Sequence, residues 1–223
     1  MKQFYKQLKL SGCALGLGVA AAIGSADIAH GATFQATLSG DQVVPGTDST
    51  ASGNMILELN EDKTQLSYSL SLSGVTLKAD QRIALRDVNK IHIHAAGPGE
   101  NGPHVLNIFG LPAEDDADLS VDYAANTLSG VWDDGDASDL NGNGIADPND
   151  SKPLTNFVTA LEAGGLYIQV HTNRFDSATG FPGELRGQIQ PTAQSTPEPL
   201  GLLGLASIAG WGFYQLKKQG RLN

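Results

Sequence analysis

The sequence predicts an all-β domain at residues 33–190, an antiparallel β-sandwich or barrel with one short helix, followed by a C-terminal apolar helix. Many short segments alternate apolar and polar residues with a period of two. The alternation is strictest at 66–72, where serines separate leucines and a tyrosine. Turns rich in Gly, Asn and Asp separate these segments. The stretch 200–216 is almost entirely apolar or small, which is typical of a short membrane-spanning helix.

Residues 1–26 are expected to form a secretory signal peptide. Lysines occupy three of the first nine positions, an apolar stretch follows at 13–23, and small residues come after it. Cleavage after Ala26, or as late as Gly31, fits this pattern. The only cysteine, Cys13, lies inside the segment, so the mature protein would contain no disulfide bond.

The acidic balance of the chain narrows its partners. A formal net charge of −10 argues against nucleic-acid binding, because phosphate backbones are bound by basic surfaces. Acidity in an exported protein fits metal ions or a hydrated matrix better. The chain has no Gly-x-Ser-x-Gly motif and no glycine-rich phosphate loop. These absences favour a non-enzymatic protein but do not decide whether the chain is an enzyme.

Eight strands and one helix are expected along the domain. The turn at 60–63 joins two strands in a hairpin, and glycines at 164 and 165 end a helix at 154–163. The serines at 66–72 indicate a sheet that packs on one face and meets water on the other. The expected strands are 33–39, 54–59, 66–72, 88–95, 104–109, 127–132, 166–172 and 184–189.

The histidines of the domain form the first candidate site. Alternation in the Ile-His-Ile-His run at 91–94 places His92 and His94 on one strand face and both isoleucines on the other. His171 likewise lies opposite the aliphatic residues of its own segment. If the two strands are neighbours, His92, His94 and His171 could bind zinc or copper, with His104 as a fourth ligand from a loop. The alternative is a polar sheet face on which the histidines bond only to water, backbone or nearby carboxylates.

The acidic insert at 133–150 is the second candidate site. Counted from Asp139, oxygen side chains fall at positions 1, 3, 5, 9 and 12, and a glycine falls at position 6. This is the ligand spacing of a calcium loop. The alternative is a solvated acidic loop. The predicted calcium ligands are the side chains of Asp139, Asn141, Asn143, Asp147 and Asp150 and the backbone carbonyl of Ile145.

Four motifs occur in order across residues 33–190. They are Phe34-x-Ala36-x-Leu38-Ser39-Gly40, Ile91-His92-Ile93-His94-Ala95 with Asn101-Gly102-Pro103, Tyr167-x-x-Val170-His171-Thr172, and Gly183-Glu184-Leu185-Arg186-Gly187-Gln188-Ile189. In these motifs the segment resembles the CHRD domain, a family named from chordin. The resemblance implies a β-rich extracellular domain with no established enzyme activity. The insert resembles the calcium loops of thrombospondin type 3 repeats.

The C-terminal end has three parts. A polar linker at 191–199 contains Pro197, Glu198 and Pro199, and an apolar stretch and a basic end follow at 200–223. This order resembles the PEP-CTERM sorting signal. The resemblance implies an exosortase that removes the tail, transient anchoring in the inner membrane, and delivery to the cell surface or extracellular matrix. The alternative is a plain C-terminal membrane anchor.

Two hypotheses for function follow from these features. The first is an exported, non-enzymatic surface or matrix module that binds calcium and an extracellular polysaccharide or protein. The second is a zinc or copper metalloprotein that uses the histidines. A redox role is part of the second hypothesis, because a β-sandwich with a His-x-His strand resembles copper-zinc superoxide dismutase at the level of the fold.

Overall fold

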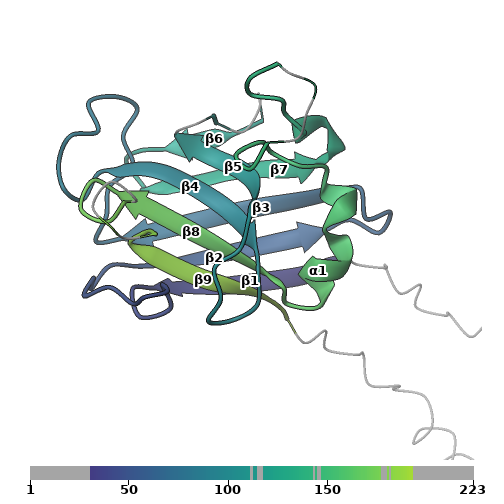
Figure 1. Cartoon of the computed structure of the whole chain (residues 1–223), viewed down its shortest axis with the longest axis horizontal. Coiled ribbons are helices and arrows are strands. Elements are labelled where there is room, and N and C mark those ends of the chain that lie inside the picture. Colours follow the sequence, from purple (N-terminus) through teal and green to yellow (C-terminus); the bar gives the residue numbers. More distant parts are fainter. Residues whose placement is uncertain are drawn as a thin grey trace, which may run out of the picture.

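One strongly curled antiparallel sheet makes up most of the domain (Figure 1). The computed structural model describes residues 31–110, 113–114, 118–142, 144, 147–176, 180 and 182–192. Within them the sheet has nine strands in the order β5-β4-β8-β9-β1-β2-β3-β7-β6. The strands are β1 (Ala32–Ser39), β2 (Ser52–Leu59), β3 (Gln65–Ser73), β4 (Val88–Ala95), β5 (His104–Gly110), β6 (Ser120–Asp122), β7 (Thr127–Asp133), β8 (Leu166–Thr172) and β9 (Leu185–Pro191).

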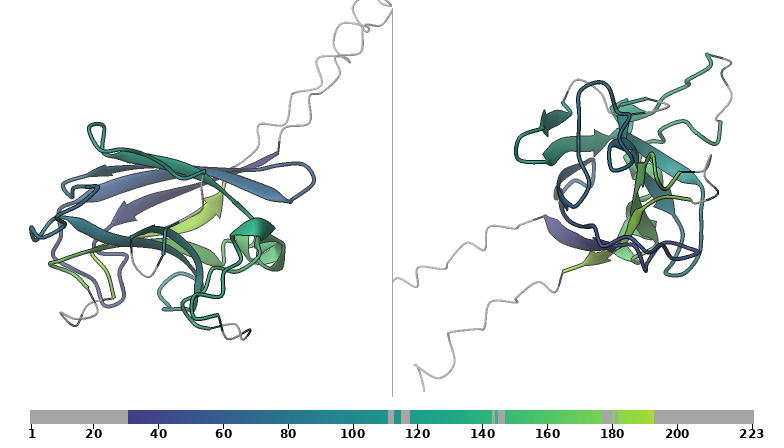
Figure 2. Two further views of the ribbon diagram at one scale, coloured as in Figure 1. Left: turned by 90° about the horizontal axis from the view of Figure 1, so that it is seen from above. Right: turned by 90° about the vertical axis from the view of Figure 1, so that its left-hand side faces the viewer.

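The curl of the sheet produces two facing layers (Figure 2). Strands β5, β4, β8 and β9 form one layer, and β1, β2, β3, β7 and β6 form the other. The layers meet where β9 pairs with β1, as in the pair Ser39 and Arg186. Buried aliphatic and aromatic residues from both layers fill the space between them and form one hydrophobic core. The prediction of an all-β antiparallel fold is confirmed in the form of a half-barrel.

Period-two patterning explains why the sheet curls around this core. In β3 every second residue is buried, and the serines between them are exposed. The pairing of Met55 with Leu70 aligns the apolar faces of β2 and β3. Lys63 has a φ of 57° in the turn that joins these two strands, which is the left-handed conformation of a tight hairpin turn.

Short helical segments cover one end of the half-barrel (Figure 1). The 3₁₀ helix η2 (Leu154–Asn156) and the helix α1 (Val158–Glu162) lie within the predicted range 154–163. They bury Leu154 and Leu161, and Gly164 follows with a φ of 69°. A further 3₁₀ helix, η1 (Asp134–Asp136), follows β7.

The predicted terminal segments lie outside the described residues. These are the signal peptide at 1–26, the apolar helix and basic tail at 200–223, and the sorting residues Pro197, Glu198 and Pro199. Among the described residues, no helix has the length and apolarity needed to span a membrane. Strand β6, a three-residue edge strand, was not predicted because its sequence is too short to show alternation.

Candidate metal centre

The outer face of β4, β5, β8 and β9 is polar but buried. Asn107, Gln169 and Arg186 on this face are each at most 2% exposed. The loop that joins β4 to β5 covers part of the face, because Arg186 donates hydrogen bonds to the carbonyls of Gly97 and Glu100. These three polar side chains are therefore largely shielded from solvent.

Three histidines converge on this face. One ring nitrogen from each of His92, His94 and His104 lies within 4.8 Å of the others. The ring centroids of His92 and His104 are 3.9 Å apart, and those of His94 and His104 are 5.1 Å apart. Tetrahedral zinc with bonds of about 2.0–2.1 Å needs nitrogens about 3.3 Å apart. Small side-chain rotations could bring the three nitrogens to that separation.

Two irregularities in the pairing of β4 with β5 bring His104 to this site. His92 pairs with Asn107 and Ile93 with Leu106, but His94 pairs with His104 because the register shifts by one residue. In a regular strand, His104 would share a face with Leu106 and point into the core. The extra residue is a β-bulge, which turns His104 to the side of His94. His104 is the first residue of β5, so its expected position in a loop is corrected.

Hydrogen bonds fix two of the rings with Nε2 free. The Nδ1 atom of His94 lies 3.1 Å from the carbonyl oxygen of Gly102, to which it donates. The His104 ring hydrogen bonds to the backbone of Asn149. The Nε2 atoms of both histidines are buried and have no hydrogen-bond partner. A histidine that donates one ring N–H to a carbonyl presents the lone pair of its other nitrogen, as metal-bound histidines do.

Burial keeps His94, His104 and His171 neutral at neutral pH. Desolvation lowers the pKa of His94 to about 4, although the Gly102 carbonyl raises it. Desolvation and the neighbouring His94 lower the pKa of His104 to about 4, and desolvation with Lys90 lowers that of His171 to about 3. Neutral imidazoles are the form that binds metal ions, so these residues need no deprotonation at neutral pH.

His171 lies beside the three converging histidines. Its ring centroid is 5.3 Å from that of His92, on the neighbouring strand β8. Both of its ring nitrogens are buried and have no hydrogen-bond partner. The group with ring nitrogens within 4.8 Å is thus His92, His94 and His104, whereas the sequence predicted His92, His94 and His171.

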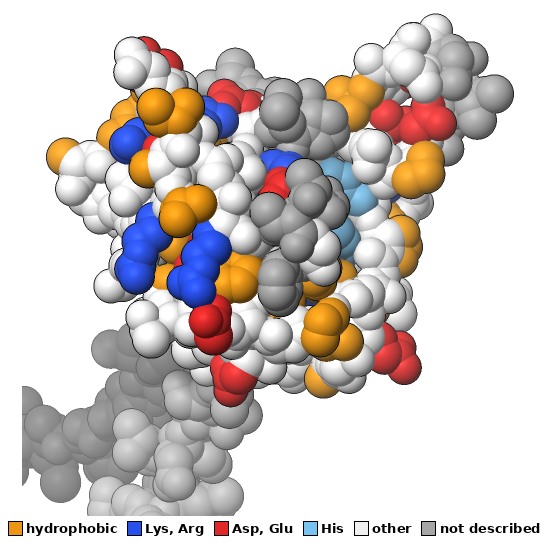
Figure 3. All heavy atoms as spheres, turned by 60° about the vertical axis from the view of Figure 1, so that its left-hand side comes forward, with side chains coloured by type: hydrophobic (Ala, Val, Ile, Leu, Met, Phe, Trp, Pro, Cys, Tyr) orange, Lys and Arg blue, Asp and Glu red, His pale blue; other side chains and the backbone are white. Residues whose placement is uncertain are grey.

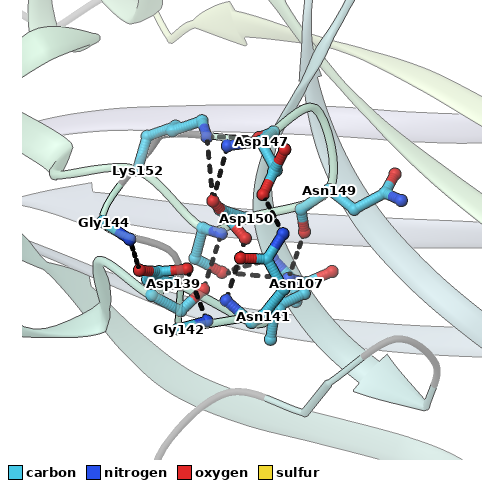
Figure 4. Close-up of polar contacts among 12 residues, drawn as sticks. Asn107, Asp139, Asn141, Gly142, Gly144, Asp147, Asn149, Asp150 and Lys152 are labelled. Carbon is cyan, nitrogen blue, oxygen red and sulfur yellow. Dashed lines mark hydrogen bonds and ion pairs between the residues drawn. The ribbon is translucent and has the colours of Figure 1, made fainter.

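The acidic insert gathers three carboxylates (Figure 4). One oxygen from each of Asp139, Asp147 and Asp150 lies within 4.8 Å of the others. The side-chain amide of Asn141 donates a hydrogen bond to the Asp147 carboxylate, which joins two of the predicted ligands. Lys152 also reaches this cluster, with its Nζ atom 3.9 Å from Asp150. Asn143 and Ile145, the other two predicted ligands, lie outside the described residues.

Backbone amides already satisfy much of the acidic cluster. Asp139 accepts hydrogen bonds from the amides of Gly142 and Gly144, and Asp150 accepts them from Leu140 and Asp147. These amide donors hold the pKa of Asp150 below its usual value. The acidic cluster therefore has partners within the protein, unlike the Nε2 atoms of His94 and His104.

The donor types of the two clusters suit different ions. Three imidazoles without a carboxylate suit zinc or copper. Carboxylate and carbonyl oxygens suit calcium. The fit to a transition metal rests on buried, unpartnered nitrogens, and the fit to calcium rests on oxygen type and spacing.

The fold and this site define a small, curled, all-β domain with a buried histidine cluster on one sheet face. A family model of the CHRD domain matches residues 34–189, so the chain belongs to the CHRD domain family. The resemblance seen in the sequence motifs is thereby confirmed for the CHRD domain. No curated protein matches the chain.

Proposed function

We propose that this CHRD domain binds a zinc or copper ion through His92, His94 and His104. The observations that carry the proposal are the buried Nε2 atoms of His94 and His104, which have no hydrogen-bond partner, and the grouping of one ring nitrogen from each of the three histidines within 4.8 Å. A buried polar atom without a partner costs about 1–3 kcal/mol. An ion held by these nitrogens would remove that cost at both atoms.

The surroundings of the histidines favour an ion that can enter and leave. Figure 3 shows histidine side chains at the molecular surface. His94 is partly exposed, whereas His92 and His104 are each 7% exposed. A site of this kind combines buried ligands with a path to solvent, which a metal site needs in order to be loaded.

Metal analysis of the full chain, purified without a polyhistidine tag, tests this proposal. The wild-type protein is expected to hold close to one zinc or copper ion per chain after loading and dialysis. The double variant His94→Gln/His104→Gln is expected to hold none. His30→Gln is the matched control, because His30 lies outside the CHRD match and outside the proposed site. Equal metal content in wild type and double variant would contradict the proposal.

A second candidate function is calcium binding at the acidic insert. It is supported by the grouped carboxylates of Asp139, Asp147 and Asp150 and by the calcium-loop spacing. Lys152 is expected to weaken calcium binding by charge repulsion, so we expect a Kd in the range of about 10⁻⁴–10⁻³ M. Calorimetry with calcium tests the idea, and an Asp139→Asn/Asp147→Asn variant with unchanged heat would refute it.

The setting of this metal-binding module is an exported one. The signal-peptide pattern at 1–26 and the PEP-CTERM pattern support transient anchoring in the inner membrane, tail removal by an exosortase, and display at the cell surface or in the matrix. An extracellular polysaccharide or protein would be its partner there. Substitution of Pro197, Glu198 and Pro199 by alanine is expected to leave the protein in the membrane fraction. Unchanged release would refute the sorting role.

A redox role would require copper at the histidine cluster. The non-enzymatic role as a surface or matrix module needs no such chemistry and remains our proposal. The two separate in one assay of the copper-loaded chain. Superoxide loss no faster than with the His94→Gln/His104→Gln variant would exclude the superoxide dismutase-like alternative.

A further inference from the structure

We infer that His171 supplies a fourth imidazole to the histidine cluster, and that the four together select copper(II) over zinc. This inference rests on the proposed function, since it extends the same site. Two observations carry it: the His171 ring lies beside that of His92, and neither of its ring nitrogens has a hydrogen-bond partner.

Strand pairing places His171 on the same face as the other three histidines. In the ladder between β4 and β8, His92 pairs with Gln169 and Lys90 pairs with His171. His171 is two residues from Gln169, so it shares the face of Gln169 and of His92. The rings of His92 and His171 are tilted by 53°, with centroids 5.3 Å apart. One ion above this face could therefore contact both rings.

The polar atoms of His171 have no use in the protein as it stands. A neutral imidazole has one N–H that donates and one lone pair that accepts. Both ring nitrogens of His171 are buried without a partner, and His171 is 7% exposed. Of the described residues with buried, unpartnered side-chain atoms, His171 alone has two such atoms. A structural histidine would hydrogen bond at one nitrogen at least.

The nearby charged pair does not satisfy this ring. Asp176 accepts from Lys90 at 2.8 Å and from Asn89 at 3.2 Å, and these bonds engage the same Oδ2 atom. Lys90 cannot accept a hydrogen bond, so it offers the ring nothing but repulsion of its protonated form. A positive ion bound by the neutral lone pair would give that nitrogen a partner.

The number and arrangement of the nitrogens favour copper. The four histidines come from three adjacent strands, β5, β4 and β8, and all lie on one face of the sheet. Ligands that lie side by side approach an ion from one side and leave its other side open. Tetragonal nitrogen sites are typical of copper(II), and imidazole sites bind copper(II) more tightly than zinc. Zinc needs only three of these rings in a tetrahedral arrangement.

Loading the full chain with copper(II), followed by electron paramagnetic resonance, tests the inference. The wild-type spectrum is expected to show hyperfine coupling of copper to four imidazole nitrogens, and the spectrum of His171→Gln is expected to show coupling to three. We expect His171→Gln to bind copper at least roughly tenfold more weakly. Loss of a residue that only hydrogen bonds to a metal ligand typically weakens binding by about that factor, and loss of a ligand should weaken it at least as much. His30→Gln is the control and should match wild type. Three nitrogens in the wild-type protein would overturn the inference even if the variant fails to fold.

Competition between ions tests the selectivity. With equal concentrations of zinc and copper(II), the wild-type chain is expected to take up copper, and His171→Gln is expected to retain more zinc than wild type does. Wild type that keeps zinc would overturn the selectivity. A wild-type chain that binds neither ion would instead refute the proposed function, so the two failures are distinguishable. Binding to three histidines with no effect of His171→Gln would refute the inference alone.

Discussion

The histidine cluster and the acidic insert are neighbouring candidate metal sites with opposite characters. The imidazoles stand on strands, are largely buried, and include four ring nitrogens without partners. The carboxylates stand on a loop and are bonded to backbone amides and to Lys152. Because of this contrast, we expect an ion at the buried nitrogens that have no partner in preference to the loop that has only the ligand-like spacing.

The two sites also touch. Asn107 on β5 donates to the carbonyl of Asn149 at 3.0 Å, and His104 hydrogen bonds to the backbone of the same residue. Asn149 directly precedes Asp150 of the acidic cluster. The insert therefore positions one imidazole of the histidine cluster, whichever ion either site holds.

The largest expected difference between the sites is the stabilisation by a bound ion. Copper or zinc at a free concentration about 1,000 times Kd should raise the free energy of unfolding by about 4 kcal/mol. Urea unfolding of the full chain, with and without the ion, measures this gain. The His94→Gln/His104→Gln variant should show no gain, while Asp139→Asn/Asp147→Asn should keep it. A loss of the gain in the aspartate variant alone would reverse the comparison.

The next largest effect is a pH dependence confined to the histidine cluster. Burial and Lys90 disfavour the charged form of His171, so its pKa is about 3 in the folded chain, whereas an unperturbed histidine has a pKa of about 6.5. The unfolded state therefore binds more protons below pH 6.5, and stability falls as the pH falls. Each histidine with a pKa lowered in this way should reduce the free energy of unfolding by about 2 kcal/mol between pH 7 and pH 5.

Urea unfolding of the metal-free chain at the two pH values measures this loss. His171→Gln should lose about 2 kcal/mol less than wild type over the same range, because its side chain does not titrate. The aspartate variant should lose as much as wild type, since carboxylates titrate at lower pH. An identical loss of stability in His171→Gln and wild type would contradict this prediction. It would show that His171 takes up a proton between pH 7 and pH 5 as readily in the folded chain as in the unfolded chain.

The smallest effect is the response to calcium. At a free concentration about ten times Kd, calcium should raise the free energy of unfolding by about 1.4 kcal/mol. Lys152→Ala removes a positive charge 3.9 Å from Asp150, so it should strengthen calcium binding. Calorimetry on both proteins measures this change. Weaker binding in Lys152→Ala would mean that Lys152 supports the loop more than it repels the ion.

Sequence patterning predicts much of the fold because the apolar face must be buried. The alternation at 66–72 corresponds to β3, and the glycine after residue 163 follows α1 as expected. The same rule places His92 and His94 opposite Ile91 and Ile93, and the isoleucines are fully buried. Local periodicity suffices for these features, since each is decided within one strand or turn.

The candidate site depends on contacts that local periodicity does not contain. His104 reaches the site through a register shift, and a one-residue bulge has no signal in the sequence of β5. The burial of the histidine face depends on loops held by Arg186, Asn107 and Asn149 across large sequence separations. Nothing in the closing motif indicates that Arg186 is buried, because arginine is normally an exposed residue.

A crystal structure of the copper-soaked chain, with anomalous diffraction at the copper edge, tests the central claim most directly. We expect one strong anomalous peak, from a copper ion about 2 Å from the Nε2 atoms of His94 and His104 and also in contact with His92 and His171. A peak among Asp139, Asp147 and Asp150, with none at the histidines, would contradict it.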